Sequence, residues 1–130
     1  MITQLRGRLV EKYPTQVVID CNGVGYLVHI SLNTFSKLPK EENAILYTYL
    51  AIREDAHVLY GFADKLEREI FTLLISVSGV GPSTARTMLS SMTSEEIQHA
   101  IASENVKTIQ SVKGIGAKTA QRIIVDLQDK

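Results

Sequence analysis

The sequence predicts an α+β protein in two parts, a small β-barrel followed by an all-helical region. Up to about residue 62 the chain consists of short segments rich in β-branched and aromatic residues that often alternate with polar ones, a pattern typical of half-buried strands. From residue 64 onward the apolar residues recur at helical spacing. Within this second part a ten-residue segment occurs twice, with its first glycine at Gly79 and again at Gly114, 35 residues later.

The first part contains five predicted strands. They are the segments ITQLRGRLVE, TQVVIDC, YLVHISL, ILYTYLAI and HVLYGF. Pro14 supplies a turn after the first strand, and Asn22-Gly23 is a strong hairpin signal between the second and the third. Five short strands must bury one face, and a closed or partly closed Greek-key barrel of the OB type does so with little free edge. A small open sandwich is the alternative.

The second part begins with signals for the start of a helix. Asp64 and Glu67 have the spacing of a capping box ahead of KLEREIFTLLISV, and Thr93 and Glu96 have it ahead of SEEIQHAIASE. Helices of this length are marginally stable alone and must pack on one another. We therefore expect a domain boundary near Ala63, which separates residues 1–63 from residues 64–130.

Composition and charge limit the classes of function. No apolar run approaches the roughly 20 residues that a membrane-spanning helix needs, and the N-terminus lacks the order of a signal peptide, so we expect a cytoplasmic protein with no membrane partner. The 14 basic and 14 acidic residues cancel, which argues against a purely electrostatic nucleic-acid binder. Residues 105–125 nevertheless contain three lysines and an arginine with no acid, so a local positive face is expected. Cys21 is the single cysteine, which excludes an internal disulfide.

The repeated segment reads SVSGVGPSTA from Ser76 and SVKGIGAKTA from Ser111. In each copy we expect a helix to end at a valine, Gly-x-Gly to turn the chain and a second helix to follow, which makes a helix-hairpin-helix. The first glycine suits the left-handed conformation that closes a helix, and Pro82 suits the opening position of the next helix. Because glycine has no Cβ, the backbone N–H groups of the loop and of the new helix are open to an anion such as phosphate.

A compact turn between packed helices would explain a single copy equally well. The duplication favours a phosphate site, because Thr84 and Thr119 follow at the same offset and Lys118 lies within one helical turn of Arg122. Two such sites would position a nucleic acid without reading its sequence. The candidate phosphate-binding residues are Gly79, Val80, Gly81, Ser83, Thr84, Gly114, Ile115, Gly116, Lys118, Thr119 and Arg122.

Alternative functions find less support in the sequence. GIGAKT superficially resembles a nucleotide-binding P-loop, but Ala117 stands where that motif needs glycine, so no nucleotide or other cofactor is expected. A helix-hairpin-helix nuclease or glycosylase is the enzyme alternative. For a metal-dependent nuclease, the sequence shows no obvious third acid to join Glu54 and Asp55, and for a glycosylase it shows no aromatic-lined base pocket. The histidines, His29, His57 and His99, show no metal-ligand spacing, so no metal site is expected.

A third alternative makes the barrel the nucleic-acid surface. Tyr47 and Tyr49 lie in one predicted strand and would stack on unpaired bases in that case. Tyrosines on one face of a half-buried sheet are more often core or subunit-contact residues.

The chain resembles the RuvA family, the Holliday-junction-binding subunits of the bacterial branch-migration complex. The segments that carry the resemblance are GVGYLVHIS, REDAHVLYGF, SGVGPSTA and GIGAKTAQRIIV, which together span nearly the whole chain. The resemblance implies an OB-fold domain, a domain with two helix-hairpin-helix motifs, and a homotetramer, with an octamer left open, that holds a four-way junction in an open square. It implies a DNA-binding subunit for recombination and repair that is not itself an enzyme.

The resemblance also assigns a role to two acids and draws attention to two departures. Glu54 and Asp55 in REDA correspond to an acidic pin beside the tetramer centre, which repels the crossing strands. Ser83 and Ala117 stand where members of the family often carry lysine, so the affinity of each hairpin is expected to be lower. In the family a linker and a third domain that contacts the RuvB ATPase motor follow, and that domain is expected to be missing here.

Overall fold

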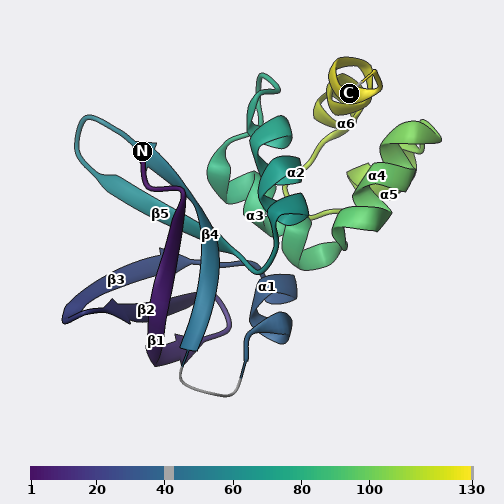
Figure 1. Ribbon diagram of the computed structural model, residues 1–130. Helices are drawn as coiled ribbons and strands as arrows, with labels where there is room; N and C mark the ends of the chain where they lie inside the picture. Colours follow the sequence, from purple (N-terminus) through teal and green to yellow (C-terminus); the bar gives the residue numbers. More distant parts are fainter. Residues whose placement is uncertain (40–42, 130) are drawn as a thin grey trace. The chain divides into compact units, whose positions relative to one another are not determined.

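The computed structural model describes residues 1–39 and 43–129, and the chain divides into two compact units, Met1–Arg68 and Glu69–Lys130. Figure 1 labels their helices and strands. The division falls within helix α2 (Lys65–Ile75), which begins in the first unit and ends in the second. Within the described residues, no helix has the length and apolar character that crossing a membrane requires.

The first unit is a closed five-stranded barrel with the strand order β1-β2-β3-β5-β4 (Figure 1). The strands are β1 (Gln4–Tyr13), β2 (Gln16–Cys21), β3 (Val24–His29), β4 (Asn43–Ile52) and β5 (His57–Phe62). All neighbouring strands are antiparallel except β3 and β5, which pair in parallel. The five predicted strands and the closed barrel are confirmed, and the open sandwich is wrong because β1 pairs with both β2 and β4.

Alternation along the strands places the apolar residues inside the barrel. In β2, for example, Val17 and Ile19 are fully buried while Val18 between them is half-buried. Burying this apolar surface is the main free-energy gain that holds such a barrel closed. The interior cluster consists of Leu5, Val17, Ile19, Val28, Ile30, Leu38, Leu46 and Leu59.

The structure contains a short helix in the first unit, α1 (Leu32–Lys37), that the sequence analysis missed. The Ser31 hydroxyl accepts a hydrogen bond from Thr34 N–H (3.0 Å) and so caps the helix. Leu38 and Phe35 pack against the barrel interior and hold α1 there. The strand-like alternation of YLVHISL continues up to this cap and concealed the start of the helix.

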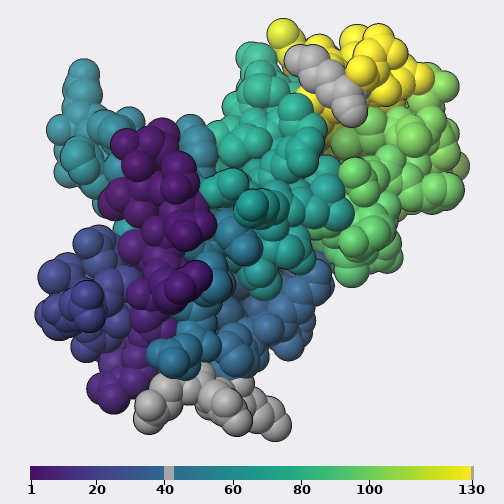
Figure 2. Space-filling view, in the orientation of Figure 1, coloured from purple at the N-terminus to yellow at the C-terminus, as the bar shows by residue number. Residues whose placement is uncertain are grey.

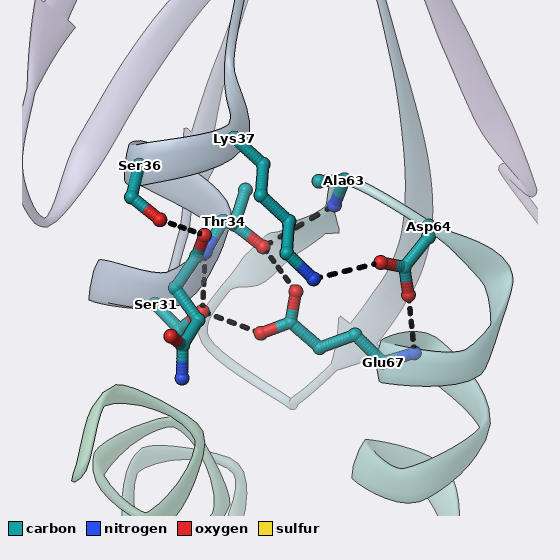
Figure 3. Close-up of polar contacts among 8 residues, drawn as sticks. Ser31, Thr34, Ser36, Lys37, Ala63, Asp64 and Glu67 are labelled. Carbon is teal, nitrogen blue, oxygen red and sulfur yellow. Dashed lines mark hydrogen bonds and ion pairs between the residues drawn. The ribbon is translucent and has the colours of Figure 1, made fainter. Parts of the chain in front are cut away.

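Glu67, in the first turn of α2, is almost completely buried although it is acidic. Asp64 Oδ1 accepts a hydrogen bond from Glu67 N–H (2.8 Å), which confirms half of the predicted capping box. The carboxylate of Glu67 turns instead to α1, where it accepts hydrogen bonds from the hydroxyls of Ser31 (2.5 Å) and Thr34 (Figure 3). These bonds join the first turn of α2 to the segment that begins α1.

The second unit is helical throughout, as predicted. After α2 it contains α3 (Pro82–Ser91), α4 (Ser94–Ala102), α5 (Val106–Gln110) and α6 (Ala117–Leu127). The predicted capping box of α4 is complete: Thr93 N–H donates to the Glu96 carboxylate (2.8 Å), and Glu96 N–H donates to the Thr93 hydroxyl (3.1 Å). The fully buried residues at the centre of the unit include Phe71, Leu74, Met88, Leu89, Ile97, Ile109 and Ile123.

Candidate nucleic-acid interface

The two repeated segments fold into the same backbone turn. Gly79 and Gly114 have φ of 94° and 90°, the left-handed conformation predicted for the first glycine of each copy. The second glycines also match, with φ and ψ of −94° and 174° at Gly81 and of −85° and 175° at Gly116. The prediction that each incoming helix ends at a valine is wrong, because α2 ends at Ile75 and the last turn before each loop is tighter than an α-helix.

The serines that open each repeat have a structural role. The Ser76 hydroxyl donates to the carbonyl of Leu73 (2.5 Å), and the Ser111 hydroxyl donates to the carbonyl of Thr108 (2.6 Å). Each bond fastens the last turn of the incoming helix, and the Leu73 carbonyl accepts from the N–H of Ser76 as well (3.2 Å). These two repeated positions are therefore explained by the turn itself.

Val80 and Ile115 anchor the two turns in the core. Their side chains are buried, and their N–H groups donate within the loops to the carbonyls of Val77 (3.0 Å) and Val112 (3.2 Å). Both of their donor groups are thus already engaged. The groups left to meet a phosphate are those of the glycines and of the first turns of α3 and α6.

The helices that follow the two turns begin differently from the others. The first turns of α1, α2, α4 and α5 are capped by side chains, those of Ser31, Asp64, Thr93 and Asn105. By contrast, α3 and α6 begin at Gly81 and Gly116 with no side-chain cap. Among the described helices, these two are therefore the only ones in which the side chain of the cap residue accepts no hydrogen bond from the N–H groups of the first turn.

The backbone at Gly81 and Gly116 does not require glycine. Their dihedral angles are close to those of Ser31, the capping residue of α1, at which φ is −85° and ψ is 165°. A Cβ added at either glycine would meet nothing within 4 Å. The first helical backbone bonds run from Ala85 N–H to Gly81 O and from Ala120 N–H to Gly116 O, each 3.0 Å. The N–H groups before them lack an intrahelical acceptor and lie beside open space.

The first hairpin and α6 form a hollow of about 520 Å³ in the second unit. Ser78 lines it from the first loop, and the other lining residues come from α6: Lys118, Thr119, Gln121, Arg122, Val125 and Asp126. An ideal Cβ on Gly79 would lie 3.9 Å from Thr119 Oγ1, so the two hairpins meet at this point. Four of the candidate phosphate-binding residues therefore lie close together in the structure: Gly79, Lys118, Thr119 and Arg122.

Four residues of this hollow were missed by the sequence analysis. Gln121, Val125 and Asp126 lie three or four residues from Lys118 or Arg122, so helical spacing alone was a signal that could have found them. Ser78 carried no such signal, because it comes from the other repeat. Of the remaining candidates, Ser83 is exposed and Thr84 is half-buried at the start of α3, and Gly114 lies in the second loop. Ala117, which stands where the family often has lysine, is exposed at the first position of α6.

The acidic pair lies at the tip of the β4–β5 hairpin. Arg53 N–H donates to Ala56 O (2.8 Å), which closes a tight turn with Glu54 and Asp55 at its two central positions. Both residues are exposed, and the hairpin end stands out from the barrel as a knob (Figure 2). In residues 1–39 and 43–129, no three His, Cys, Asp or Glu side chains are grouped to hold a metal ion. The structure therefore places no third ligand beside the pair.

The tyrosine alternative is not favoured by the surroundings of Tyr47. Lys65 Nζ and Arg68 Cζ each lie 5.7 Å from the centroid of its ring, and Arg68 also donates to the carbonyl of Thr3 (2.6 Å). A ring that two cations already contact is a poor platform for stacking a base. Tyr49, in the same strand, is half-buried.

Comparisons with known proteins match two family models to separate parts of the chain. Residues 1–61 match the RuvA N-terminal domain, and residues 71–129 match the SAM-like helix-hairpin-helix tandem. The chain is similar along its whole length to proteins named Holliday junction branch migration complex subunit RuvA. Identities are 66% with that of Christiangramia forsetii, 62% with that of Flavobacterium psychrophilum and 60% with that of Bacteroides thetaiotaomicron. It covers 67%, 67% and 65% of these three relatives, so it spans about two-thirds of their length.

Proposed function

The chain belongs to the RuvA family, and from this premise we propose that it binds four-way (Holliday) junction DNA through backbone phosphates and holds the junction open for branch migration. Its place is then in bacterial DNA recombination and repair, in the cytoplasm. A nuclease or glycosylase function is not favoured, because the relatives are named as branch-migration subunits.

One observation carries the proposal. Gly81 and Gly116 have the backbone geometry of a capping residue but no side chain to cap the helix that follows. The other described helices of both units each have a side-chain cap. N–H groups at a helix start bind anions well, because the helix dipole adds to their own polarity. A phosphate oxygen thus takes the place that a serine or threonine hydroxyl occupies elsewhere in the chain.

The side chains beside the second hairpin add charge to this site. Lys118 and Arg122 line the hollow with Thr119, so a phosphate bound there meets two cations and a hydroxyl. None of these groups faces a base edge in such an arrangement, so binding depends on DNA shape and not on sequence. Charge-assisted hydrogen bonds to phosphate are about twice as strong as neutral ones.

The acidic tip acts in the opposite sense. Glu54 and Asp55 are exposed at the end of a hairpin and repel phosphates that approach it. Two unit charges 4 Å apart repel by about 1 kcal/mol in water and about 4 kcal/mol at the effective dielectric of a protein surface. Several such tips around one centre would disfavour continuous duplex there and favour four separated arms.

The chain acts as one of several copies and without catalysis of its own. Its net charge is zero, so a single copy binds DNA weakly, and a homotetramer or octamer sums the contacts around one junction. The energy for movement comes from a separate ATPase motor, RuvB.

The test compares one four-way junction with a linear duplex of the same sequence in fluorescence-anisotropy titrations. We expect tighter binding to the junction, indifference to base sequence, and affinity that falls steeply as salt rises. Light scattering with and without the junction gives the number of copies bound. A folded sample that binds both DNAs equally would overturn the proposal, and cleavage of the junction in Mg²⁺ would favour the nuclease.

A further inference from the structure

A carboxylate lies among the basic groups of the hollow between the first hairpin and α6. Asp126 lines this hollow together with Lys118 and Arg122. Its Oδ2 is 3.8 Å from Nε of Arg122, one helical turn earlier, and their side chains are 41% and 59% exposed. Arg122, one of the two basic residues that line the hollow, is therefore already paired with an anion of the protein.

The stability of α6 does not explain this acid. Asp126 lies in the last turn of the helix, where the macrodipole favours cations, and α6 has no basic residue in that turn. The pair also has the less favourable order, because the acid stabilises more when it precedes the base by four residues. An ion pair as exposed as this one contributes little to folding.

We propose that Asp126 competes with DNA phosphate for Arg122 and so keeps the contact in this hollow weak and exchangeable. The inference rests on the proposed function and concerns how that site is tuned. A phosphate that reaches Arg122 must displace the Asp126 carboxylate or share the guanidinium with it. DNA whose arms slide past the protein must break and remake such contacts at every step, and a carboxylate that takes Arg122 back lowers the cost of each release.

The experiment measures junction binding by the wild-type chain, Asp126→Asn, Arg122→Gln and the double variant. Asparagine keeps the size of the side chain and removes its charge. We expect D126N to bind the junction about threefold to tenfold more tightly, chiefly through slower dissociation. The slope of log affinity against log salt should steepen by up to about 0.9 for each hollow engaged, because one more phosphate is neutralised. A merely structural role for Asp126 would not change this slope.

Two comparisons make the result specific. Glu95→Gln removes the same charge from an exposed position of α4, outside this hollow, and should change affinity by less than about twofold. In the Arg122→Gln background, D126N should also have less than about a twofold effect, because the group for which it competes is gone.

Each outcome has one meaning. Tightening by D126N that disappears with Arg122 supports the competition. Equal tightening in both backgrounds would overturn it, since Asp126 would then act by plain repulsion, and unchanged affinity of D126N would overturn it as well. Neither of these two results touches the proposed function, which stands as long as the wild-type chain prefers the junction to linear duplex. Loss of that preference in the unchanged chain overturns the proposed function.

Discussion

A Cβ built on Gly79 would lie 3.9 Å from Oγ1 of Thr119, so the loop of the first hairpin rests against the start of the second hairpin's last helix. The two residues are 40 positions apart in the chain, and Thr119 lines the hollow together with Ser78, the neighbour of Gly79. The proposed phosphate sites of the two repeats are therefore neighbours on one surface. The proposed function assigns the Thr119 hydroxyl to the DNA contact, whereas a merely compact turn would not need a hydroxyl at this position.

Thr119→Val tests this hydroxyl. Valine keeps the branched shape, so the free energy of unfolding should change little, while a hydrogen bond to a charged phosphate is lost. We expect junction affinity to fall about tenfold, measured by anisotropy. Thr87→Val is the matched control, because the Thr87 hydroxyl donates only to a carbonyl of its own helix, that of Ser83 (3.0 Å). Equal affinity for wild type and T119V would contradict the role.

The glycines that open α3 and α6 should respond to a cap. In Gly81→Ser and Gly116→Ser, the new hydroxyl accepts from the N–H groups that we assign to phosphate, as Ser31 does in α1. The variants should be unchanged or a few tenths of a kcal/mol more stable to denaturant, because serine is a slightly better cap than glycine. Junction affinity should nevertheless fall about tenfold for the double variant. Stability and binding would thus change in opposite directions.

The first glycine of each turn gives the contrasting result. Gly79→Ala and Gly114→Ala place a side chain at φ near 90°, which costs about 1–2 kcal/mol of folding free energy. Urea denaturation followed by circular dichroism measures both sets of variants. If G81S and G116S lost as much stability as G79A and G114A, the cap argument would be wrong.

Neutralising the acidic tip should reduce the preference for the junction over linear duplex. Glu54→Gln with Asp55→Asn preserves the turn closed by Arg53 and Ala56 and removes two negative charges. We expect binding to linear duplex to tighten by about tenfold or more and binding to the junction to tighten less, so that the preference for the junction shrinks. Glu95→Gln with Glu104→Gln removes the same charge from the helical unit and should leave the preference intact. A gel-shift titration in which the tip variant gains equally on both DNAs refutes the pin.

The sequence predicted those features that depend on local pattern and left out those that depend on contacts between distant segments. The five strands and the two left-handed glycines follow from period and turn chemistry, and both are confirmed. Helix α1 was missed because its cap follows a strand without a break in the apolar pattern. The place of Glu67 could not be predicted, since its hydroxyl partners lie more than 30 residues earlier in the chain.

The same limit applied at the candidate site. Val80 and Ile115 share the repeat with the glycines, and only the structure distinguishes buried anchors from open positions. Ser78 meets α6 only because the two repeats fold against each other. Asp126 is charged and exposed, and its significance depends on the hollow that it lines.

The hydroxyls around Glu67 should be important for stability. Thr34 donates to the Glu67 carboxylate and accepts from Ala63 N–H (3.2 Å), so Thr34→Val leaves the buried carboxylate and the partly buried N–H each without one partner. We expect the free energy of unfolding to fall by about 2 kcal/mol or more. Thr72→Val, which removes a hydroxyl bonded only to the carbonyl of Glu69 (2.8 Å), is the control and should cost much less. Similar losses in the two variants would show that the network around Glu67 is not special.

The pH dependence of stability should carry the signature of Glu67. Burial raises the pKa of its carboxyl above the ordinary value of 4.5, opposed in part by the hydrogen bonds from Ser31 and Thr34. Because the folded pKa exceeds the unfolded one, the group's stabilising contribution is fully present below pH 4.5 and is lost as pH rises through the folded pKa. Glu67→Gln removes this titration. The unfolding free energy of the wild type relative to E67Q should therefore be greatest below pH 4.5. It should decrease as pH rises from 4.5 through the folded pKa of Glu67 and then level off. Urea denaturation at a series of pH values measures the difference, and a difference that grew with pH would mean that the native environment favours the ionised carboxylate.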